Sequence, residues 1–375
     1  RTTTMKNIKI KRDELVHVMY DGGVFAGKNK IMPVLDNVCI TTKGNRIRIE
    51  SSDSENYIRS YGFCETTADM SFCVNANEFA SYIGLLNDED ITMNYDSDKK
   101  QLIIKHANGE IKLPTTNANE FPVMKPMKET TKIELSGEMF AGWLKKAGNF
   151  AMKGDKGIVL EGIYIYANSD YIGVCGGEHS MIFTARMRNK DNIPDFSVVL
   201  PKKSASIMAR MCATAEKVTL MQDENALYIR TDNTIVYSLL LNLKYPNVAL
   251  LFNQMGHCHV TIEKSTLLQA VKRIESQTVK DDLSLHLHCT GSSLELYYDV
   301  IAEYNKHLSE SIPCEGDAFD DVIVNLEYLR NVLTNYSSDK VLFHHDNSER
   351  SPFFFEDKSE DSLELFLFSV MVNKP

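Results

Sequence analysis

The sequence has little that would support a membrane protein or a disulfide-stabilised secreted domain. No apolar run approaches the ~20 residues that a membrane-spanning helix needs. The eight cysteines form no CxxC pair, which favours a reduced, intracellular protein over a disulfide or zinc framework. The amino-terminal residues lack the charged-then-apolar order of a signal peptide. We therefore expect an intracellular globular protein without a membrane segment.

Positive charge is also in short supply. The formal net charge is −10 for 375 residues, which argues against a protein that grips nucleic acid over its whole surface but leaves room for a local basic face. Hydrophobic residues make up 43% and charged residues 25%, which is typical of a globular protein with real cores. The length suggests two to three domains.

Catalytic and metal-binding motifs are missing as well. The sequence has no GxSxG elbow, and Gly176-Gly177 lacks both the Walker lysine and the dinucleotide fingerprint. His257-Cys258-His259 has no second ligand pair nearby, and the two histidines of a strand would face away from the cysteine. His344-His345-Asp346 is interpreted as an exposed loop. We expect no catalytic residues, no metal site and no cofactor.

The sequence does contain a repeat. Ile8–Met19, Ile133–Leu144 and Val260–Val271 each read as a short strand, a turn and the first turns of a helix. Aligning Ile8, Ile133 and Val260 also aligns their later apolar positions, with offsets of 125 and 127 residues. A second landmark, Val74, Val199 and Val324, recurs at a spacing of 125 residues. The chain is therefore interpreted as three copies of one unit.

Each unit reads as strand, helix and strands, followed by the same order again. This pattern predicts an α+β fold in which two amphipathic helices cover one face of antiparallel sheet. Phe121-Pro122 and Tyr245-Pro246 mark the boundaries, which gives domains at 5–125, 126–253 and 254–375. Asn75 is expected to cap the second helix, Pro201 to open the fourth, and the final strand to run through Val372. The predicted helices are Asp13–Tyr20, Ala76–Leu86, Gly137–Asn149, Pro201–Ala213, Lys264–Ser276 and Leu326–Tyr336.

Units with open sheet edges tend to pair edge to edge, and identical units joined head to tail close into a ring or continue as a filament. The residues alone leave more than one kind of protein open. One is a structural ring or interaction protein without DNA, and another is an enzyme with an interdomain cleft. The enzyme would need converging titratable groups, and none recur at matching positions.

The ordered pattern resembles the bacterial beta sliding clamp, the processivity subunit of the replicative DNA polymerase, and the resemblance covers the chain from Met5. Individual motifs are weak, whereas their order and the triple repeat are specific. The motifs that carry it are Ile31–Leu35, Leu160-Glu161-Gly162, Val174–Met181, Tyr245-Pro246-Asn247 and the terminal strand Phe366–Val372.

The resemblance implies a function without catalysis. It implies three clamp domains per chain, a head-to-tail homodimer, a six-domain ring lined by helices, and double-stranded DNA threaded through it without sequence preference. It also implies that the replicative polymerase and the clamp loader bind through short hydrophobic peptides. A cytoplasmic, nucleoid-associated location is expected, or the host cytoplasm if a phage encodes the protein.

Basic residues on the predicted helices and their loops are the candidates for the ring lining. They would touch phosphates weakly, salt-sensitively and without reading sequence. The alternative is that each is an ordinary solvated side chain on a helix. The candidates are Lys28, Lys30, Lys145, Lys146, Lys153, Lys156, Lys202, Lys203, Arg210, Lys272, Arg273 and Lys280, with Arg330 as a further member.

The resemblance also implies a partner-peptide pocket between the second and third domains. Aliphatic and methionine side chains suit a groove that accepts short hydrophobic peptides. The implied residues are Leu160, Cys175, Gly176, Glu178, Met181, Pro246, Leu251, Val370, Met371 and Val372. The turn Gly176-Gly177-Glu178 and the ending Val372–Pro375 depart from the usual family pattern, so the resemblance does not define the preferred peptide.

Overall fold

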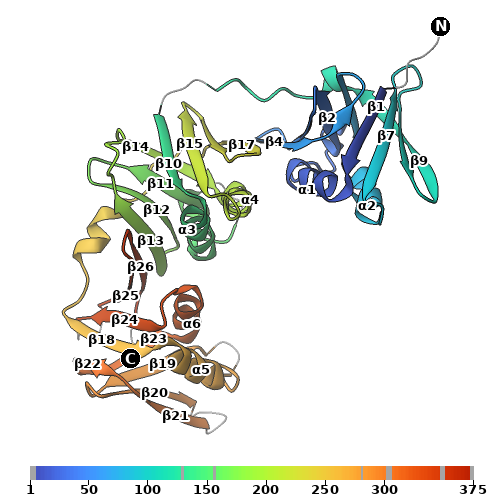
Figure 1. Ribbon diagram of the computed structural model, residues 1–375. Helices are drawn as coiled ribbons and strands as arrows, with labels where there is room; N and C mark the ends of the chain where they lie inside the picture. The colour runs from blue at the N-terminus through green and yellow to red at the C-terminus, as the bar shows by residue number, and fades with distance from the viewer. Residues whose placement is uncertain are drawn as a thin grey trace. The chain divides into compact units, whose positions relative to one another are not determined.

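The computed structural model describes residues 6–127, 131–154, 158–279, 282–300, 306–346 and 351–371 (Figure 1). The chain divides into two compact units. Unit 1 comprises Arg1–Gly142 and Lys203–Leu240, and unit 2 comprises Trp143–Lys202 and Leu241–Pro375. Among the described residues, no helix is both long and apolar enough to cross a membrane.

Unit 1 is built on one antiparallel sheet, which has 13 strands in the described part of the chain. The strands lie in the order β10-β15-β16-β17-β4-β3-β2-β6-β9-β8-β7-β1-β5. Their bounds are β1 (Lys6–Lys11), β2 (Asn37–Lys43), β3 (Arg46–Ser52), β4 (Asn56–Phe63), β5 (Glu65–Thr66), β6 (Met70–Asn75), β7 (Asp90–Asp96), β8 (Gln101–His106), β9 (Gly109–Asn117), β10 (Thr131–Ser136), β15 (Lys217–Asp223), β16 (Ala226–Arg230) and β17 (Thr234–Leu239).

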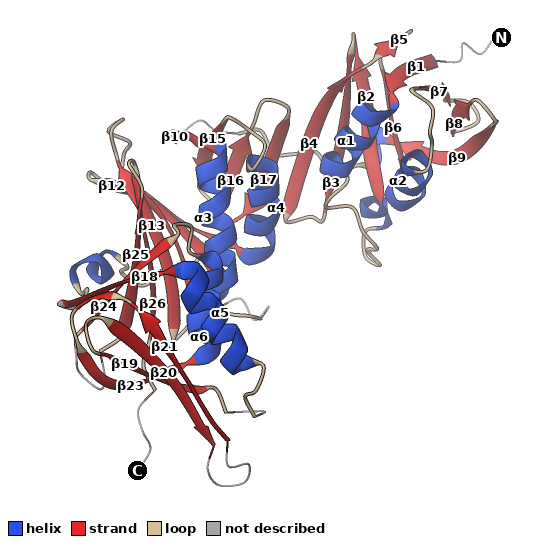
Figure 2. Cartoon of the chain, turned by 60° about the horizontal axis from the view of Figure 1, so that its bottom comes forward, coloured by secondary structure: helices blue, strands red, loops and turns tan. Residues whose placement is uncertain are grey.

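Helices cover one face of this sheet. α1 (Arg12–Gly22) packs on β3, β4 and α2 (Ala76–Gly84), as Figure 2 shows. Leu15, Val18 and Met19 of α1 are buried because the spacing i, i+3, i+4 places them on one helix face. Each such side chain stabilises the fold by about 1.5–3 kcal/mol when it leaves water. The Asn75 side chain caps α2 by accepting a hydrogen bond from the Glu78 N–H at 3.0 Å, as predicted.

The other face of this sheet is partly covered by the segment that leaves the first repeat. That segment includes a short 3-10 helix, η2 (Ala118–Glu120). Phe121 packs on Cys39 and Cys73, and Met124 packs with Tyr228 and Tyr237. The remaining helical segments of the unit are η1 (Pro33–Asp36), most of α4 (Lys202–Cys212) and the start of α3 (Gly137–Phe150).

Unit 2 contains two antiparallel sheets, of nine and four strands among the described residues. Their orders are β14-β11-β12-β13-β26-β25-β24-β18-β22 and β21-β20-β19-β23. The bounds are β11 (Gly162–Ala167), β12 (Tyr171–Gly177), β13 (Met181–Arg188), β14 (Phe196–Pro201), β18 (Cys258–Glu263), β19 (Ser284–Cys289), β20 (Ser293–Val300), β21 (Lys306–Pro313), β22 (Glu315–Gly316), β23 (Phe319–Asn325), β24 (Lys340–His345), β25 (Phe353–Lys358) and β26 (Ser362–Phe368).

The helices of unit 2 are α5 (Lys264–Glu275) and α6 (Leu326–Asn335), which contact each other, together with the larger part of α3. Two 3-10 helices, η3 (Val159–Glu161) and η4 (Ala249–Asn253), lie in its loops. Phe150 of α3 packs against Phe183 and Phe366, with ring centroids 6.1 and 5.6 Å away. These rings join β13 and β26 beneath the helix, so aromatic packing stabilises this part of the sheet.

The repeat is visible in the strand positions. The fourth strand of each repeat occupies Asn56–Phe63, Met181–Arg188 and Lys306–Pro313, in steps of 125 residues. The first two of these strands pair with the last strand of the following repeat. β4 pairs with β17, and β13 pairs with β26, both antiparallel. The α+β class with repeated helix-and-sheet units is confirmed.

The predicted elements agree with the structure apart from three local errors. Pro201 is the last residue of β14 rather than the first of a helix, because it still pairs in the sheet and α4 begins at Lys202. β26 ends at Phe368, short of Val372. His344 and His345 belong to β24 and are buried, not an exposed loop. The domain division at 5–125, 126–253 and 254–375 stays a prediction. The two compact units group strands that share a sheet, and such sheets contain strands from more than one repeat.

Candidate nucleic-acid interface and peptide pocket

The predicted lining cations fall into groups according to their surroundings. Lys28 and Lys30 lie in the loop between α1 and η1, Lys145 lies on α3, and Lys272 lies on α5. Lys153 follows α3. All five are exposed or partly exposed, and none forms an ion pair with another described residue. These ammonium groups are available to phosphates.

Three other predicted cations are already neutralised. The Nζ of Lys203 lies 2.9 Å from the Asp53 carboxylate. Arg273 donates through Nε to Glu310 on β21 at 2.7 Å, and the second nitrogen of the same guanidinium also pairs with that carboxylate. Lys146 pairs with Glu364 of β26 and donates to Ser337 Oγ at 2.7 Å.

Lys146 and Lys202 are two candidates that are only partly exposed and that already have partners within the chain. The Lys146 side chain is only 14% exposed. Lys202 donates to the Ala151 carbonyl at 3.0 Å, and burial, followed by the charge of Lys153, lowers its pKa. The sequence could not reveal this, because the partners come from segments that the repeat pattern does not relate to these lysines.

Arg210 makes a different kind of contact. Its guanidinium lies 4.3 Å from the centroid of the Tyr20 ring on α1, which joins α4 to α1 within unit 1. Arg330 pairs with Glu275 of α5 at 2.8 Å. Both arginines therefore connect helices of the folded chain, whether or not a phosphate is bound. Lys156 and Lys280 lie outside the described residues.

The structure brings several predicted pocket residues together in unit 2. Leu160, Cys175 and Leu251 belong to one apolar cluster. The same cluster includes Tyr245 and Val248, which sequence reasoning did not name as pocket residues. Tyr245 stacks on Tyr164 with ring centroids 4.9 Å apart. The Tyr-Pro boundary motif could have signalled this aromatic, since it immediately precedes Pro246.

Cys175 and Gly176 are buried, so neither contributes to the accessible surface of this apolar cluster. Burial raises the pKa of the Cys175 thiol to about 12, which keeps it neutral. A Cβ on Gly176 would lie 2.2 Å from the carbonyl oxygen of Ala147. Glycine is therefore required there by the close approach of α3.

The rim of the cluster is partly accessible. Pro246 is exposed, while Glu178 and Met181 are intermediate. The N–H of Glu178 donates to the Met181 carbonyl at 2.8 Å, which closes the β12–β13 turn. Asn331 of α6 lies 4.0 Å from the Met181 sulfur. Met181 is thus positioned by both β13 and α6.

The C-terminal tail does not continue as a strand with alternating faces. Leu365, Phe366, Leu367 and Phe368 are all buried, because Phe366 packs under α3 while Leu367 packs with Phe252 of η4. Beyond β26, the N–H of Met371 donates to the Ile323 carbonyl at 2.8 Å, and its side chain is 38% exposed. Val370 is intermediate, and Val372 lies outside the described residues.

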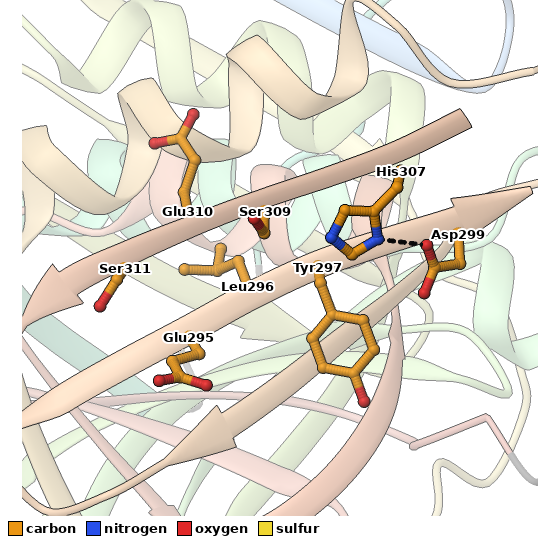
Figure 3. Close-up of a pocket in the computed structure, with 8 residues that line it drawn as sticks. All are labelled: Glu295, Leu296, Tyr297, Asp299, His307, Ser309, Glu310 and Ser311. Atoms are coloured by element: carbon orange, nitrogen blue, oxygen red, sulfur yellow. Dashed lines mark hydrogen bonds and ion pairs between the residues drawn. The ribbon is translucent and has the colours of Figure 1, made fainter. Parts of the chain in front are cut away.

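One edge of β21 pairs with no strand in the described part of the chain, since β21 pairs there with β20 alone. A shallow pocket of about 620 Å³ lies over these two strands (Figure 3). His307 and Asp299 face each other there, with Nδ1 2.5 Å from the carboxylate. The lining residues are Glu295, Leu296, Tyr297, Asp299, His307, Ser309, Glu310 and Ser311.

Several histidines outside these two regions make contacts within the fold. The described residues contain no group of three His, Cys, Asp or Glu side chains that could hold a metal ion. The Nδ1 atoms of His259 and His344 lie 2.7 Å apart, and His344 Nε2 lies 3.0 Å from Glu356. His345 stacks on Phe353 at 4.5 Å. Burial lowers the pKa of both His344 and His345.

Comparison with known proteins agrees with this architecture. Residues 6–125 match the family profile "DNA polymerase III beta subunit, N-terminal domain", and residues 134–247 match that of the central domain. The beta sliding clamp of Rickettsia bellii is 20% identical over 352 residues, covering 90% of this chain and 92% of that protein. The Staphylococcus epidermidis beta sliding clamp is 20% identical over 372 residues, covering 96% and 97%.

Solved structures give the same result for the fold. A sliding clamp from Pseudomonas aeruginosa bound to griselimycin superposes with a TM-score of 0.90 at 16% identity, covering 98% of this chain and all of that one. A Caulobacter crescentus clamp gives a TM-score of 0.86 at 17% identity and covers 98% of this chain. The protein therefore has the sliding-clamp fold. The two profile matches together span more than half of the chain. It belongs to the DNA polymerase III beta subunit family, the beta sliding clamps.

Proposed function

We propose that this protein is a DNA sliding clamp that closes into a homodimeric ring around double-stranded DNA and tethers the replicative polymerase. Family membership supports the clamp role, and the observation that carries ring closure is the repeat of strand pairing. β4 pairs with β17 and β13 with β26, whereas β21, the third strand of that set, has an unpaired edge in the described chain.

The partner for that edge would be the last strand of the first repeat. β9 begins at Gly109 and β17 at Thr234, again 125 residues apart, so β9 is the counterpart of the strand that receives β4. Residues 109–114 of β9 pair with β8 on one side. A second copy could therefore join its β21 to this β9, and two such junctions would close a ring of two chains.

DNA would pass through the ring held by enclosure and by weak phosphate contacts. Lys28, Lys30, Lys145, Lys153 and Lys272 would supply those contacts, because unpaired ammonium groups attract phosphates without reading bases. No side chain is assigned a catalytic role, and the proposal places the protein in the cytoplasm with the replicating DNA.

Polymerase and loader would attach through hydrophobic peptides at the apolar cluster of unit 2. Leu160, Met181, Pro246, Leu251 and Met371 would form its accessible surface. Short apolar peptides suit this surface because it combines aliphatic, methionine and aromatic groups. Cys175 and Gly176 would act only as support.

Retention on circular DNA tests the topological part of the proposal. The clamp would be assembled on nicked circular plasmid with a clamp loader, separated by gel filtration, and then treated with a restriction enzyme. We expect the protein to stay with the circle and to leave after linearisation. Equal retention on both forms would mean surface binding rather than encirclement. A mass of about twice 42.5 kDa in sedimentation would support the dimer.

A further inference from the structure

The sheet of unit 1 has a face turned away from α1, here called the outer face. A Cβ on Gly62 would lie 2.6 Å from Val18 of α1, so Gly62 faces the helix. Its neighbours in β4, Tyr61 and Phe63, therefore face the other way. Through the antiparallel register, Arg48 pairs with Tyr61, and Arg46 pairs with Phe63. These side chains thus share the outer face.

Cations dominate this face across five adjacent strands. Lys43 of β2 lies opposite Arg46, and Ile235 of β17 lies between Arg59 and Arg230 in the register. The carboxylate that these strands place on the face is Glu50, opposite Arg59. The cations on the outer face are Lys43, Arg46, Arg48, Arg59 and Arg230. The concentration contrasts with the net charge of −10 for the whole chain.

Glu50 pairs with two of these arginines, and its single negative charge does not neutralise the five cations of the face. Its carboxylate pairs with Arg48 Nε at 2.9 Å and also with Arg59. One carboxylate thus orients two guanidinium groups, and their remaining N–H donors can meet an anion. Arg48 and Arg59 stay 33% and 23% exposed. Asp69 accepts a hydrogen bond from the Gly44 N–H at the edge of the face.

Aromatic rings lie among the cations. The Phe63 side chain is 63% exposed, an unusual position for a large apolar ring. Arg46 covers part of it, with the guanidinium carbon 5.5 Å from the ring centroid. Tyr61 is half-buried beside Arg48. Elsewhere on the outer face, Met124 packs against Tyr228 and Tyr237 and covers their rings. Phe63 does not belong to that cluster, so Met124 does not cover the Phe63 ring.

We propose that this basic and aromatic face binds single-stranded nucleic acid. Guanidinium and ammonium groups would meet the phosphates, while exposed rings would stack on unpaired bases, which is the combination that sequence-independent single-strand binders use. Strands lie ~4.8 Å apart, so five strands give a width of about 19 Å, enough for several nucleotides. A sheet face offers no helix to enter a duplex groove, and the carboxylates of an acidic peptide would not pack on an exposed phenyl ring.

The proposal is separate from encirclement of duplex DNA, because it concerns the face of the sheet opposite α1. Its test uses the full chain and a fluorescein-labelled 20-nucleotide oligothymidine, with affinity measured by anisotropy at low salt. Two variants carry the test. Arg46→Glu reverses a charge, and Phe63→Leu removes the ring but keeps an apolar side chain. Both positions are exposed, so folding is retained, which thermal unfolding checks.

We expect Arg46→Glu to weaken binding by about tenfold at low salt, with a smaller effect as salt rises. Phe63→Leu should weaken binding roughly fivefold, the effect of removing one base stack. Lys105→Glu on β8 and Lys358→Glu on β25, both at exposed positions, are controls of equal charge change and should bind as the parent does. Full-strength binding by both test variants would overturn the proposal.

Three further outcomes would also count against it. Weaker binding by Lys145→Glu, with unchanged binding by Arg46→Glu, would place the single strand on the helix side. Tighter binding of a labelled 20-base-pair duplex than of the oligothymidine, abolished by Arg46→Glu, would make the face a duplex site. Displacement of the oligonucleotide by a polyglutamate peptide at lower concentration than by unlabelled oligothymidine would make it a protein-docking surface.

Discussion

Lys146 of α3 and Glu364 of β26 form an ion pair whose two side chains are only 14% and 13% exposed. Burial raises the pKa of the Glu364 carboxyl, and the Lys146 ammonium opposes that rise. A lysine that was expected to meet DNA is therefore part of the structural framework of unit 2. Removing one partner of the pair would leave a poorly solvated charge behind, which leads to a first prediction.

Lys146→Met should lower the free energy of unfolding by roughly 1–3 kcal/mol at neutral pH, the cost of leaving a buried hydrogen-bonding group without its partner. Without the lysine, the folded-state pKa of Glu364 rises further above its unfolded value. Stability should then increase as pH falls through that raised pKa, since the folded state binds the proton more tightly. Urea unfolding between pH 5 and 8 measures both effects. Lys145→Met, one residue earlier and exposed, is the control, and an equal destabilisation there would contradict the assignment.

A second prediction concerns the close approach of α3 to β12. Gly176→Ala should destabilise the protein by roughly 1–3 kcal/mol or more, because the new Cβ would meet the backbone oxygen of Ala147. Gly148→Ala, on the same helix with open space around its Cβ, should instead stabilise by about 0.4–1 kcal/mol. Thermal unfolding of the two variants compares them directly, and similar behaviour would mean that α3 does not pack as described.

A third prediction uses pH. Burial lowers the pKa of His344, with His259 acting in the same direction and Glu356 opposing it. The unfolded histidine, with a pKa of about 6.5, binds protons that the folded one refuses, so stability should fall as pH drops below about 6.5. His344→Gln should flatten that part of the stability curve. The exposed His179→Gln should leave it unchanged, and an unaltered slope in His344→Gln would contradict the prediction.

A fourth prediction addresses the DNA-facing cations. Changing Lys28, Lys145 and Lys272 together to Glu should leave the fold intact, because all three are exposed and have no ion-pair partner among the described residues. Duplex binding should weaken, and the slope of log affinity against log salt should shrink by about one for each phosphate that the protein no longer neutralises. Lys9→Glu on β1 is the control. An unchanged slope would mean that these lysines do not meet the DNA.

A fifth prediction concerns the tail. Deleting Val370–Pro375 should abolish binding of polymerase-derived hydrophobic peptides while the dimer survives, since ring closure is assigned to β21 and β9. Met371→Asp alone should weaken peptide binding roughly 30-fold, the effect of removing a ~2 kcal/mol anchor. Fluorescence anisotropy measures affinity and sedimentation measures the dimer. Full-strength peptide binding by the truncated dimer would place the pocket elsewhere.

The repeat made most of the fold accessible from the sequence. Aligning Ile8, Ile133 and Val260 located a strand and a helix in each of the three repeats. The helices α1, α3 and α5 begin within one residue of their expected starts. Such periodic signals are local, so a single sequence carries them. The end of β26 was missed for the opposite reason, because beyond Phe368 the N–H of Met371 donates to the Ile323 carbonyl, which lies in a segment distant in the chain.

The candidate site was less predictable than the fold. Charge alone could not distinguish Lys145, which is exposed, from Lys146, which finds a carboxylate 218 residues later. Cys175 was predicted to belong to the pocket, but its burial depends on how β12 packs under α3, which the sequence does not show. The identity of a side chain gives its chemistry, whereas its accessibility depends on tertiary contacts that no local pattern encodes.

The pairing of β4 with β17 and of β13 with β26 uses peptide N–H and carbonyl groups. Every residue except proline carries both groups, so such seams place few demands on which amino acids occupy the strands. Most side chains along these strands can therefore be substituted during evolution while the strand pairing is retained. This explains how a clamp that shares 16% of its residues with this chain can still superpose with a TM-score of 0.90.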